Sequence, residues 1–408
     1  MIVTSEGILT NYRLLEIHNK GENENLAGKR FILHLIVICM YELEITEYDK
    51  VKPLFKPMDY HLAVNAIIER NIPAQVYVDD PDHPQAALTW VKHRFFLAGS
   101  EKNSEFNKNI EQFFADTLYP RALKNEENMF VLYYYPSGWE DKINIILKDK
   151  YPIKVQRQFY AFKKLQYDWR TQLPHGFTVH LVDEALLCRK HLKNLDNLKA
   201  EMCSERQSVT DFLRKSFGIC VIHNDEIVGW CLSEYNTGDQ CEIGIETTEP
   251  YRKRGFATLT ASALIEYCLS KGITHIGWHC TARNKPSAAT ALKVGFEKVR
   301  DYSVFCAWFD EVRNLGMNGY FCFENQQYSE ALNWCEKALA RGVAEPWVYW
   351  DAARAAAVLG NNKTALSYLV QAVNKGFTNL ELIKNSEYLM SLHETREWKE
   401  LIENLEST

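Results

Sequence analysis

The sequence lacks the signatures of several large functional classes. It has no GxxxxGK[ST] phosphate loop and no GxGxxG fingerprint, which argues against P-loop nucleotidases and Rossmann dinucleotide enzymes. Its 11 cysteines include no CxxC pair and no combination with histidine that looks like a zinc site, so we expect no metal. The net charge of −6, without a long block of one sign, gives no nucleic-acid-binding footprint.

An apolar run near the N-terminus falls short of what a membrane span needs. Residues 31–40, FILHLIVICM, are too few to cross a bilayer. Three interpretations stay open: a signal-peptide core, although no small-residue cleavage site follows; a buried strand; and an upstream extension, with the natural start at Met40. The many free thiols and the missing export signal predict a cytoplasmic protein without membrane contact.

The composition is that of a globular protein with several domains. Of its 408 residues 46% are hydrophobic and 25% charged, and this length is enough for roughly two to four domains. The patterning predicts an uncertain extension over residues 1–40, an α+β domain over 41–165, an α/β domain over 175–309 and a helical tail over 310–408.

The most informative stretch, residues 241–269, joins a strand to a helix. Apolar and polar residues alternate over 241–247, which predicts a half-buried strand with Glu242 and Glu246 on one face. After Gly255 the apolar residues recur at helical spacing.

The turn between this strand and helix, RKRGFA, is built to hold phosphate. A helix start offers unpaired amide N–H groups and a positive dipole, which can cradle a diphosphate. Gly255 lets the backbone approach the phosphates, and the Arg and Lys side chains add positive charge. The alternative interpretation is an ordinary solvated turn.

This turn resembles motif A of the GNAT acetyltransferases, R/Q-x-x-G-x-G/A after a strand, which binds the pyrophosphate of acetyl-coenzyme A. Arg252, Gly255 and Ala257 fill the three defining places. The resemblance implies acetyl-coenzyme A as cosubstrate and a ternary-complex transfer to an amine. We expect no metal in that chemistry.

A second family pattern follows in the right order. GNAT proteins carry an Asn after the next strand, then a small residue, then a helix that ends in Gly-Phe; here these are Asn284, Ser287 and Gly295-Phe296. One departure matters, because many members place a proton-donating Tyr where this chain has Ala291.

The resemblance implies a set of site residues. Contacts to the coenzyme are expected from Ile245, Thr247, Arg252, Lys253, Arg254, Gly255, Phe256, Ala257, Thr258, Asn284 and Ser287. Glu242, which stands nearest the family's base position, and Glu246 are the candidate general bases; a solvated strand carboxylate is the alternative. His279 is a weaker candidate. Tyr251 and Tyr302 are both open as replacements for the missing acid.

The order of predicted elements implies a GNAT fold over residues 177–309. We expect a hairpin over Asn224-Asp225-Glu226 and a final pair of strands within 296–309. In the first domain, residues 89–97 read as one strand, and residues 153–162 resemble 296–305. The first domain is therefore interpreted as a degenerate copy without the phosphate turn, an arrangement that looks like the zwittermicin-resistance subgroup.

The tail carries a repeat of helical character. Ala331 and Ala338 recur as Ala365 and Ala372, an offset of 34 residues, which is the tetratricopeptide period. A generic helical hairpin is the alternative. Either way we expect an interaction element for a protein partner or a second copy of the chain.

Two classes of function stay open. The first is an N-acetyltransferase that acts on a primary amine of a small molecule, such as an amino-containing antibiotic or metabolite. The second is a non-catalytic acyl-coenzyme A sensor or scaffold that acts through the tail.

Overall fold

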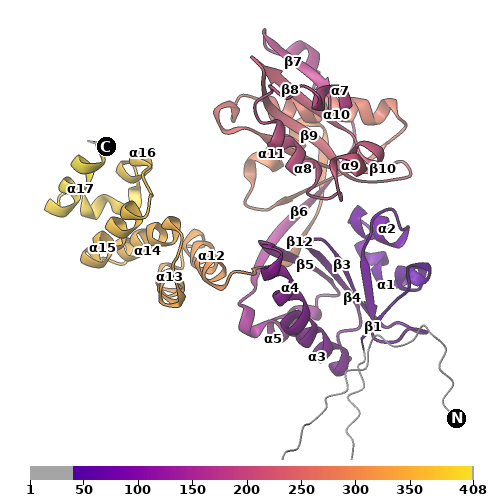
Figure 1. The fold of residues 1–408 in the computed structure, drawn as a ribbon, viewed down its shortest axis with the longest axis horizontal. Helices are drawn as coiled ribbons and strands as arrows, with labels where there is room; N and C mark the ends of the chain where they lie inside the picture. The colour runs from indigo at the N-terminus through magenta and orange to yellow at the C-terminus, as the bar shows by residue number, and fades with distance from the viewer. Residues whose placement is uncertain (1–39, 407–408) are drawn as a thin grey trace, which may run out of the picture.

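The computed structural model describes residues 40–406, and the interpretations of residues 1–39 lie outside this part of the chain. We name three parts: a first half (residues 41–162), a second half (169–308) and a tail (311–406). Figure 1 shows the two halves joined by the long strands β6 and β12, with the tail projecting to one side.

In the first half, strands are interleaved with short helices. Its elements are β1 (Tyr41–Glu42), η1 (Ile45–Val51), α1 (Lys52–Phe55), η2 (Lys56–Met58), α2 (Leu62–Ile68), β2 (Gln75–Val78), β3 (Ala86–Val91), β4 (Arg94–Gly99), α3 (Ser104–Phe113), η3 (Phe114–Leu118), α4 (Tyr119–Lys124), β5 (Met129–Tyr135), α5 (Trp139–Ile146), η4 (Lys148–Lys150) and β6 (Ile153–Phe162). The expectation of one strand over 89–97 is wrong, because a tight turn at Lys92-His93 makes it the hairpin of β3 and β4.

The second half repeats this order of elements. They are α6 (Trp169–Gln172), β7 (Phe177–Leu181), α7 (Glu184–Leu187), α8 (Leu195–Met202), α9 (Val209–Lys215), β8 (Gly218–His223), β9 (Glu226–Thr237), β10 (Gln240–Thr247), η5 (Glu249–Tyr251), α10 (Phe256–Ser270), β11 (His275–Thr281), α11 (Lys285–Val294) and β12 (Phe296–Trp308). The β8–β9 hairpin turns on Asn224 and Asp225 alone, both with positive φ, and Glu226 already belongs to β9.

All twelve strands belong to one continuous sheet, ordered β1-β2-β3-β4-β5-β12-β6-β11-β10-β9-β8-β7. β12 pairs with β5 of the first half, while β6 pairs with β11 of the second. The expected final pair of strands is therefore wrong: residues 296–308 are one strand, and its neighbour in the second half is β6, lent by the first. A hydrophobic pattern cannot show this exchange, because it tells which face of a strand is buried and not which strand pairs with its edge.

Helices and loops fix the second half around α10. This helix is apolar on most of its faces because it is buried between the sheet and neighbouring helices. α11 ends at Gly295, which has φ +112°, and a Cβ at this position would overlap the carbonyl oxygen of Lys164. Only glycine satisfies both the turn and the close approach.

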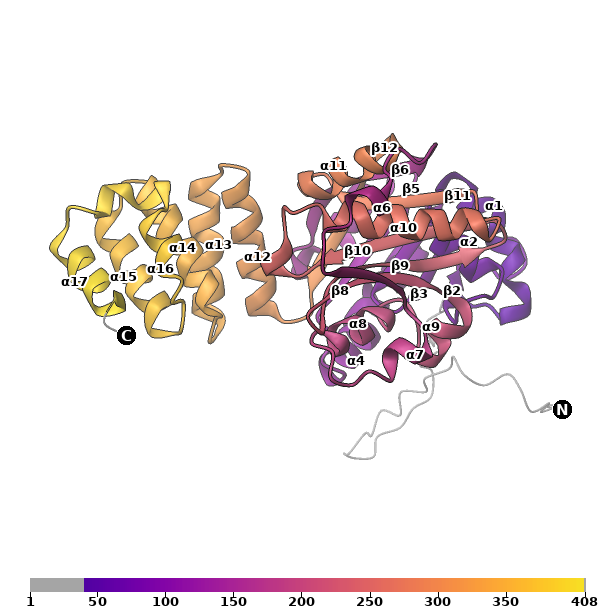
Figure 2. The same cartoon turned by 90° about the horizontal axis from the view of Figure 1, so that it is seen from above.

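The tail is a row of antiparallel helices (Figure 2). They are α12 (Glu311–Glu324), α13 (Tyr328–Arg341), α14 (Pro346–Val358), α15 (Asn362–Asn374), α16 (Leu380–Lys384), η6 (Glu387–Leu392) and α17 (Arg396–Glu406). The alanines of the 34-residue repeat, Ala331, Ala338, Ala365 and Ala372, are all buried between helices. At Gly319 a Cβ would lie 2.6 Å from Cys335 Sγ, which shows how closely α12 and α13 approach.

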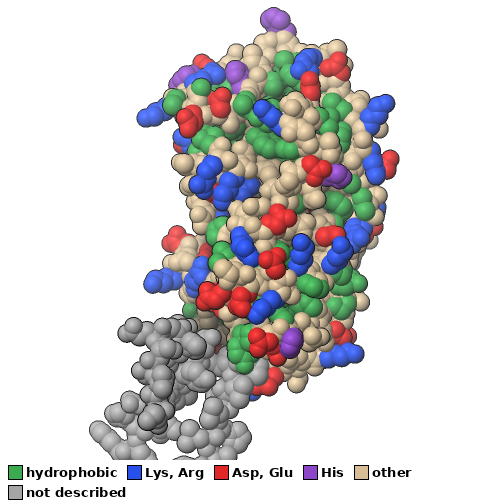
Figure 3. Space-filling model, turned by 90° about the vertical axis from the view of Figure 1, so that its right-hand side faces the viewer, with side chains coloured by type: hydrophobic (Ala, Val, Ile, Leu, Met, Phe, Trp, Pro, Cys, Tyr) green, Lys and Arg blue, Asp and Glu red, His purple; other side chains and the backbone are tan. Residues whose placement is uncertain are grey.

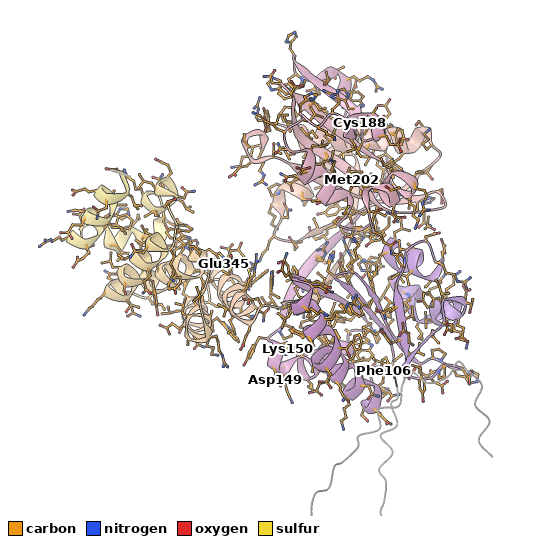
Figure 4. All side chains as sticks on the ribbon, in the orientation of Figure 1. Phe106, Asp149, Lys150, Cys188, Met202 and Glu345 are labelled. Atoms are coloured by element: carbon orange, nitrogen blue, oxygen red, sulfur yellow. The ribbon has the colours of Figure 1, made fainter. Side chains whose placement is uncertain are left out.

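Asn314 fastens the tail to the sheet. Its Oδ1 accepts from Trp308 N–H at 2.9 Å and its Nδ2 donates to Lys150 C=O at 2.8 Å. Figure 4 labels Lys150 on the side of the first half that faces the tail. Asn314 thus joins the tail to the last residue of β12 and to the segment just before β6, through backbone groups of Trp308 and Lys150.

Candidate active site

The turn before α10 has the geometry that its sequence predicts. Gly255 is the N-cap residue with φ +89°, and nothing lies within 4 Å of a Cβ built there. The first bond at this helix start runs from Leu259 N–H to Gly255 C=O at 3.0 Å. The amide N–H groups of Phe256, Ala257 and Thr258 therefore have no hydrogen-bond partner within the helix and point out of its start.

The side chains of this turn divide into exposed cations and buried anchors. Arg252, Lys253 and Arg254 are exposed, and the Arg254 guanidinium lies 5.2 Å from the centre of the Tyr251 ring. Phe256 is buried, with its ring centre 4.7 Å from that of Phe177. Thr258 is buried as well, so it meets a ligand only through its backbone.

An opening lies between β10 and β11. The parallel ladder pairs only three residues of each strand and ends at Glu242 and Gly277. Beyond that point β10 stays paired with β9 up to Thr247, and β11 stays paired with β6 up to Thr281. The two strands therefore splay, and the edge of β10 from residue 243 onward is left without a strand partner.

The predicted contacts along this opening fall into two groups. Ile245 is half-buried, and Thr247 is buried with an Oγ1 that has no partner among residues 40–406. Asn284 accepts from Ser287 N–H at 3.1 Å and so caps α11, while Ser287 Oγ accepts from Trp278 Nε1 at 3.0 Å. The capping alternative for Asn284 is thus what the structure shows.

The two glutamates proposed as bases have different surroundings. Glu242 is buried: it accepts from Leu62 N–H, and an oxygen lies 3.4 Å from His279 Nε2. Glu246 is half-buried and lies 3.1 Å from the Arg252 guanidinium. Neither carboxylate is free of a partner, and Glu242 is covered by α2 of the first half.

The sequence analysis missed Glu234, whose carboxylate lies over Gly244, just beyond the end of the β10–β11 ladder. It is the extra residue of a β-bulge, where β9 supplies two residues opposite one step of β10. Its carboxylate occupies the space that a side chain at Gly244 would need. The bulge could not be read from alternation; the available signal was one Glu inside the apolar strand IVGWCLSEYNT.

Glu234 is also electrostatically unusual. Burial raises the pKa of its carboxyl to about 7; the Arg94 guanidinium 3.5 Å away lowers it, while nearby Glu205, Glu242 and Glu201 raise it. A carboxylate poised near neutral pH is suited to general-base catalysis.

Arg94 belongs to a buried charge network that sequence reasoning also missed. It donates to Glu205 and, at 3.0 Å, to the Tyr133 hydroxyl, and Glu205 accepts from the Tyr235 hydroxyl as well. Arg94 comes from the first half and Glu205 from the second, so their pairing depends on the packing of the two halves.

Comparison with known proteins decides the family. Residues 52–305, more than half of the chain, match the profile of the GNAT acetyltransferases. The chain belongs to the GNAT acetyltransferase family. Membership makes it an N-acetyltransferase, an acyl-transferring enzyme.

Similar proteins include a GNAT relative from Bacillus subtilis (strain 168), the uncharacterized N-acetyltransferase YdfB. It is 27% identical over 267 residues, which are 65% of this chain and 98% of YdfB. A GCN5-related N-acetyltransferase-like protein from Streptococcus suis 89/1591 is 23% identical, with a TM-score of 0.49 over 64% of this chain and 98% of its own. A tandem GNAT protein from the clavulanic acid biosynthesis pathway is 10% identical, with a TM-score of 0.44 over 66% of this chain and 98% of its own.

The structure separates the two tyrosines left open as replacements for the GNAT acid. Tyr251 lies away from the splayed strands and donates to Glu226 at 3.3 Å. Tyr302 is hydrogen-bonded to His279 Nδ1 at 2.9 Å and accepts from Arg157 Nε at 3.1 Å, and burial raises its pKa. Ala291 is fully buried in the core, so that position does not face the opening.

Two further observations concern metal binding and membrane-spanning helices, and the distribution of surface charge. Among residues 40–406 no group of three His, Cys, Asp or Glu side chains is arranged to hold a metal ion, and none of the helices is long and apolar enough to cross a membrane. On the face shown in Figure 3, basic and acidic side chains are interspersed, without a continuous patch of one sign.

Proposed function

We propose that this GNAT enzyme transfers the acetyl group of acetyl-coenzyme A to a primary amine of a small molecule, by direct attack in a ternary complex. The observation that carries the proposal is the placement of Glu234 over Gly244. It puts a carboxylate over β10 just beyond the point where the ladder between β10 and β11 ends.

The α10 turn and the splayed strands fit the coenzyme. The amides of residues 256–258 and the cations of 252–254 would hold the diphosphate. The pantetheine arm would run along β10 from residue 243 to 247, where Ile245 offers apolar contact and Thr247 Oγ1 an unmet hydrogen-bonding group. Asn284 and Ser287 would support the far side by fixing the start of α11.

The transfer follows from this geometry. Glu234 takes the proton of the incoming ammonium, and the neutral amine attacks the thioester carbonyl. A backbone N–H of the unpaired β10 edge stabilises the oxyanion. The C–N bond forms, the C–S bond breaks, and the coenzyme leaves as a thiolate that then takes a proton.

The charge around Glu234 favours a cationic acceptor. Glu201 and Glu246 lie near, and burial raises the pKa of Glu201, with further increases from Glu205 and Glu246. Around Glu234 the carboxyl groups of Glu201, Glu205 and Glu242 outnumber the guanidinium groups of Arg94 and Arg157. Such a field attracts an ammonium group and not a carboxylic acid.

A cavity of suitable size lies beside this charge network. It has a volume of about 860 Å³ and is bounded by both halves, with Trp90, Arg121 and Asn128 on one side and Gln207 and Glu205 on the other. Pockets of this volume hold small molecules. Its lining includes Glu205 but neither Glu234 nor any residue of β10 or of the α10 turn. The proposal of an aminated antibiotic as acceptor therefore rests on the resemblance to zwittermicin-resistance proteins.

We infer that the first half is a degenerate GNAT copy that binds no coenzyme. Its β4–β5 ladder pairs five residues of each strand and does not splay. The start of α3 is capped by the side chain of Asn103, which accepts from Phe106 N–H at 3.0 Å. Both features close the space that the second half leaves open, and both fit a supporting role for this half.

The tail is proposed to be a tetratricopeptide-like interaction element, for a protein partner or a second copy of the chain. A hollow of about 310 Å³ between α12 and α14, lined by Met317, Tyr320, Trp347 and Trp350, supports this. The ten cysteines among residues 40–406 are all free, which supports a cytoplasmic location.

The first experiment is calorimetric titration of the full chain with acetyl-coenzyme A, followed by a thiol-release screen over polyamines, aminoglycosides, amino acids and peptides. We expect binding and amine-dependent thiol release. Binding without release from any amine would favour the alternative, a sensor that acts through the tail. No binding would overturn the assignment of the turn.

A further inference from the structure

A small closed cavity lies at the contact between the two halves, behind Glu234. Its volume is about 40 Å³. Its lining brings together side chains from seven different elements, most of them polar: His61, Arg94, Tyr133, Arg157, Glu234 and Glu242. These side chains are far apart in the sequence, and only the packing of the first half on the second creates the cavity.

One polar atom of this lining has no partner. His61 is only 4% exposed, and its Nε2 has no hydrogen-bond partner among residues 40–406. The ring stacks on His279 with centroids 5.0 Å apart and 18° between the planes. Burial, and then the nearby His279, lower the pKa of His61 well below its usual range, so the ring is neutral. A buried polar atom of this kind requires a hydrogen-bonding partner.

The cavity has the size and chemistry to hold that partner. About 10–15 Å³ of accessible space is enough to hold one water molecule, and a buried water usually makes two to four hydrogen bonds. His61, Glu234 and Glu242 offer bonds from different sides, and the buried guanidinium groups of Arg94 and Arg157 are donors.

We propose that this cavity binds an ordered water that is hydrogen-bonded to His61 Nε2 and connects the carboxylates of Glu234 and Glu242. Next to Glu242 lies His279: its Nε2 is 3.4 Å from the carboxylate and donates to Tyr60 C=O at 3.2 Å, and its Nδ1 is hydrogen-bonded to Tyr302 at 2.9 Å. The first half thereby supplies a positioning residue, His61, to the centre of the second.

The role of this water rests on the proposed function. An ammonium acceptor loses two protons when it becomes an amide; the thiolate takes one of them and the solvent receives the other. Glu234 takes the first proton and passes it through the water to Glu242, which leaves Glu234 free for the second. The two carboxylates thus hold one proton each until the thiolate and the solvent take them. This arrangement explains how the enzyme manages without a tyrosine at Ala291.

The direct test is a high-resolution crystal structure of the unchanged full chain. We expect an ordered water at about 3 Å from His61 Nε2 and within hydrogen-bond distance of Glu234 and Glu242. An empty cavity, or a direct contact between Glu234 and Glu242, would overturn the proposal. This test is independent of activity, so it stands even if the acceptor is not an amine.

Variants provide a second test. His61→Leu removes the polar atom, His61→Gln keeps one, and His83→Gln is the control in an exposed turn. With carboxyl-carbon NMR, His61→Leu should shift the titration of Glu234 upward by about one pH unit and lower kcat about tenfold, with KM for coenzyme unchanged. His61→Gln should keep most of the unchanged enzyme's kcat and its Glu234 titration. An unchanged titration and kcat in folded His61→Leu would contradict the proposal.

Discussion

The carboxylate of Glu234 lies in the space above the Cα of Gly244, where any larger residue would displace it. Gly244 belongs to the strand that the resemblance assigns to the coenzyme, and Glu234 to the neighbouring strand β9. The relation exists because a β-bulge places one extra residue in β9 at this point. The family pattern suggested a base on β10, and this relation favours the proposed base on β9 instead.

Replacing Glu234 should separate chemistry from coenzyme binding. Glu234→Gln should lower kcat about a hundredfold or more, because the base is lost, and leave the affinity for acetyl-coenzyme A within about twofold. Glu242→Gln should lower kcat less, because it acts through the cavity. Glu297→Gln, on an exposed strand position, is the control. Steady-state kinetics and calorimetry measure both quantities, and an active Glu234→Gln would assign the base elsewhere.

The pH profile should report the ionisation of Glu234. A base acts in its ionised form, so with a pKa near 7 the value of kcat/KM should fall about tenfold for each pH unit below pH 7 and level off above it. The groups that set this midpoint are Arg94, which lowers it, and Glu205, Glu242 and Glu201, which raise it. A midpoint near pH 4.5 would mean that the carboxylate is solvated and that these neighbours do not act on it.

Gly255 should be essential for coenzyme binding. Gly255→Val places a side chain where the phosphates approach and forces a β-branched residue to φ +89°. Gly272→Val is a matched control, because Gly272 has φ +78°, open space around its Cβ position, and lies at the other end of the same helix. We expect calorimetric binding to be lost in the first variant and kept in the second. Equal affinities would remove the turn from the site.

The attachment of the tail should depend on Asn314. Asn314→Ala leaves a buried N–H and a buried C=O unpaired, which should cost about 3 kcal/mol of stability at the junction. Asn318→Ala removes one bond to Tyr151 C=O and one to Asn314 C=O within its own helix, both 3.0 Å long, on a less buried side chain, and should cost about 1 kcal/mol. Thermal unfolding and limited proteolysis of the junction compare the two. Similar losses would show that the tail is held by other contacts.

Local patterns predicted much of the second half. The turn at Gly255, the strand before it and the apolar helix after it depend on neighbours in sequence: helix periodicity, strand alternation and the backbone freedom of glycine. The repeat of small residues in the tail likewise predicted helices that approach closely, and Gly319 shows that approach.

Only the tertiary structure brings together the residues of the proposed catalytic centre. His61, Arg94 and Arg157 come from the first half, and Glu234 reaches the opening only through a bulge. The exchange of β6 and β12 is also invisible in the sequence, since both strands present similar faces. Local sequence determined which backbone can hold phosphate, because that needs only consecutive amides. The choice of base depended on packing, because a carboxyl changes its pKa only through the groups that distant segments bring against it.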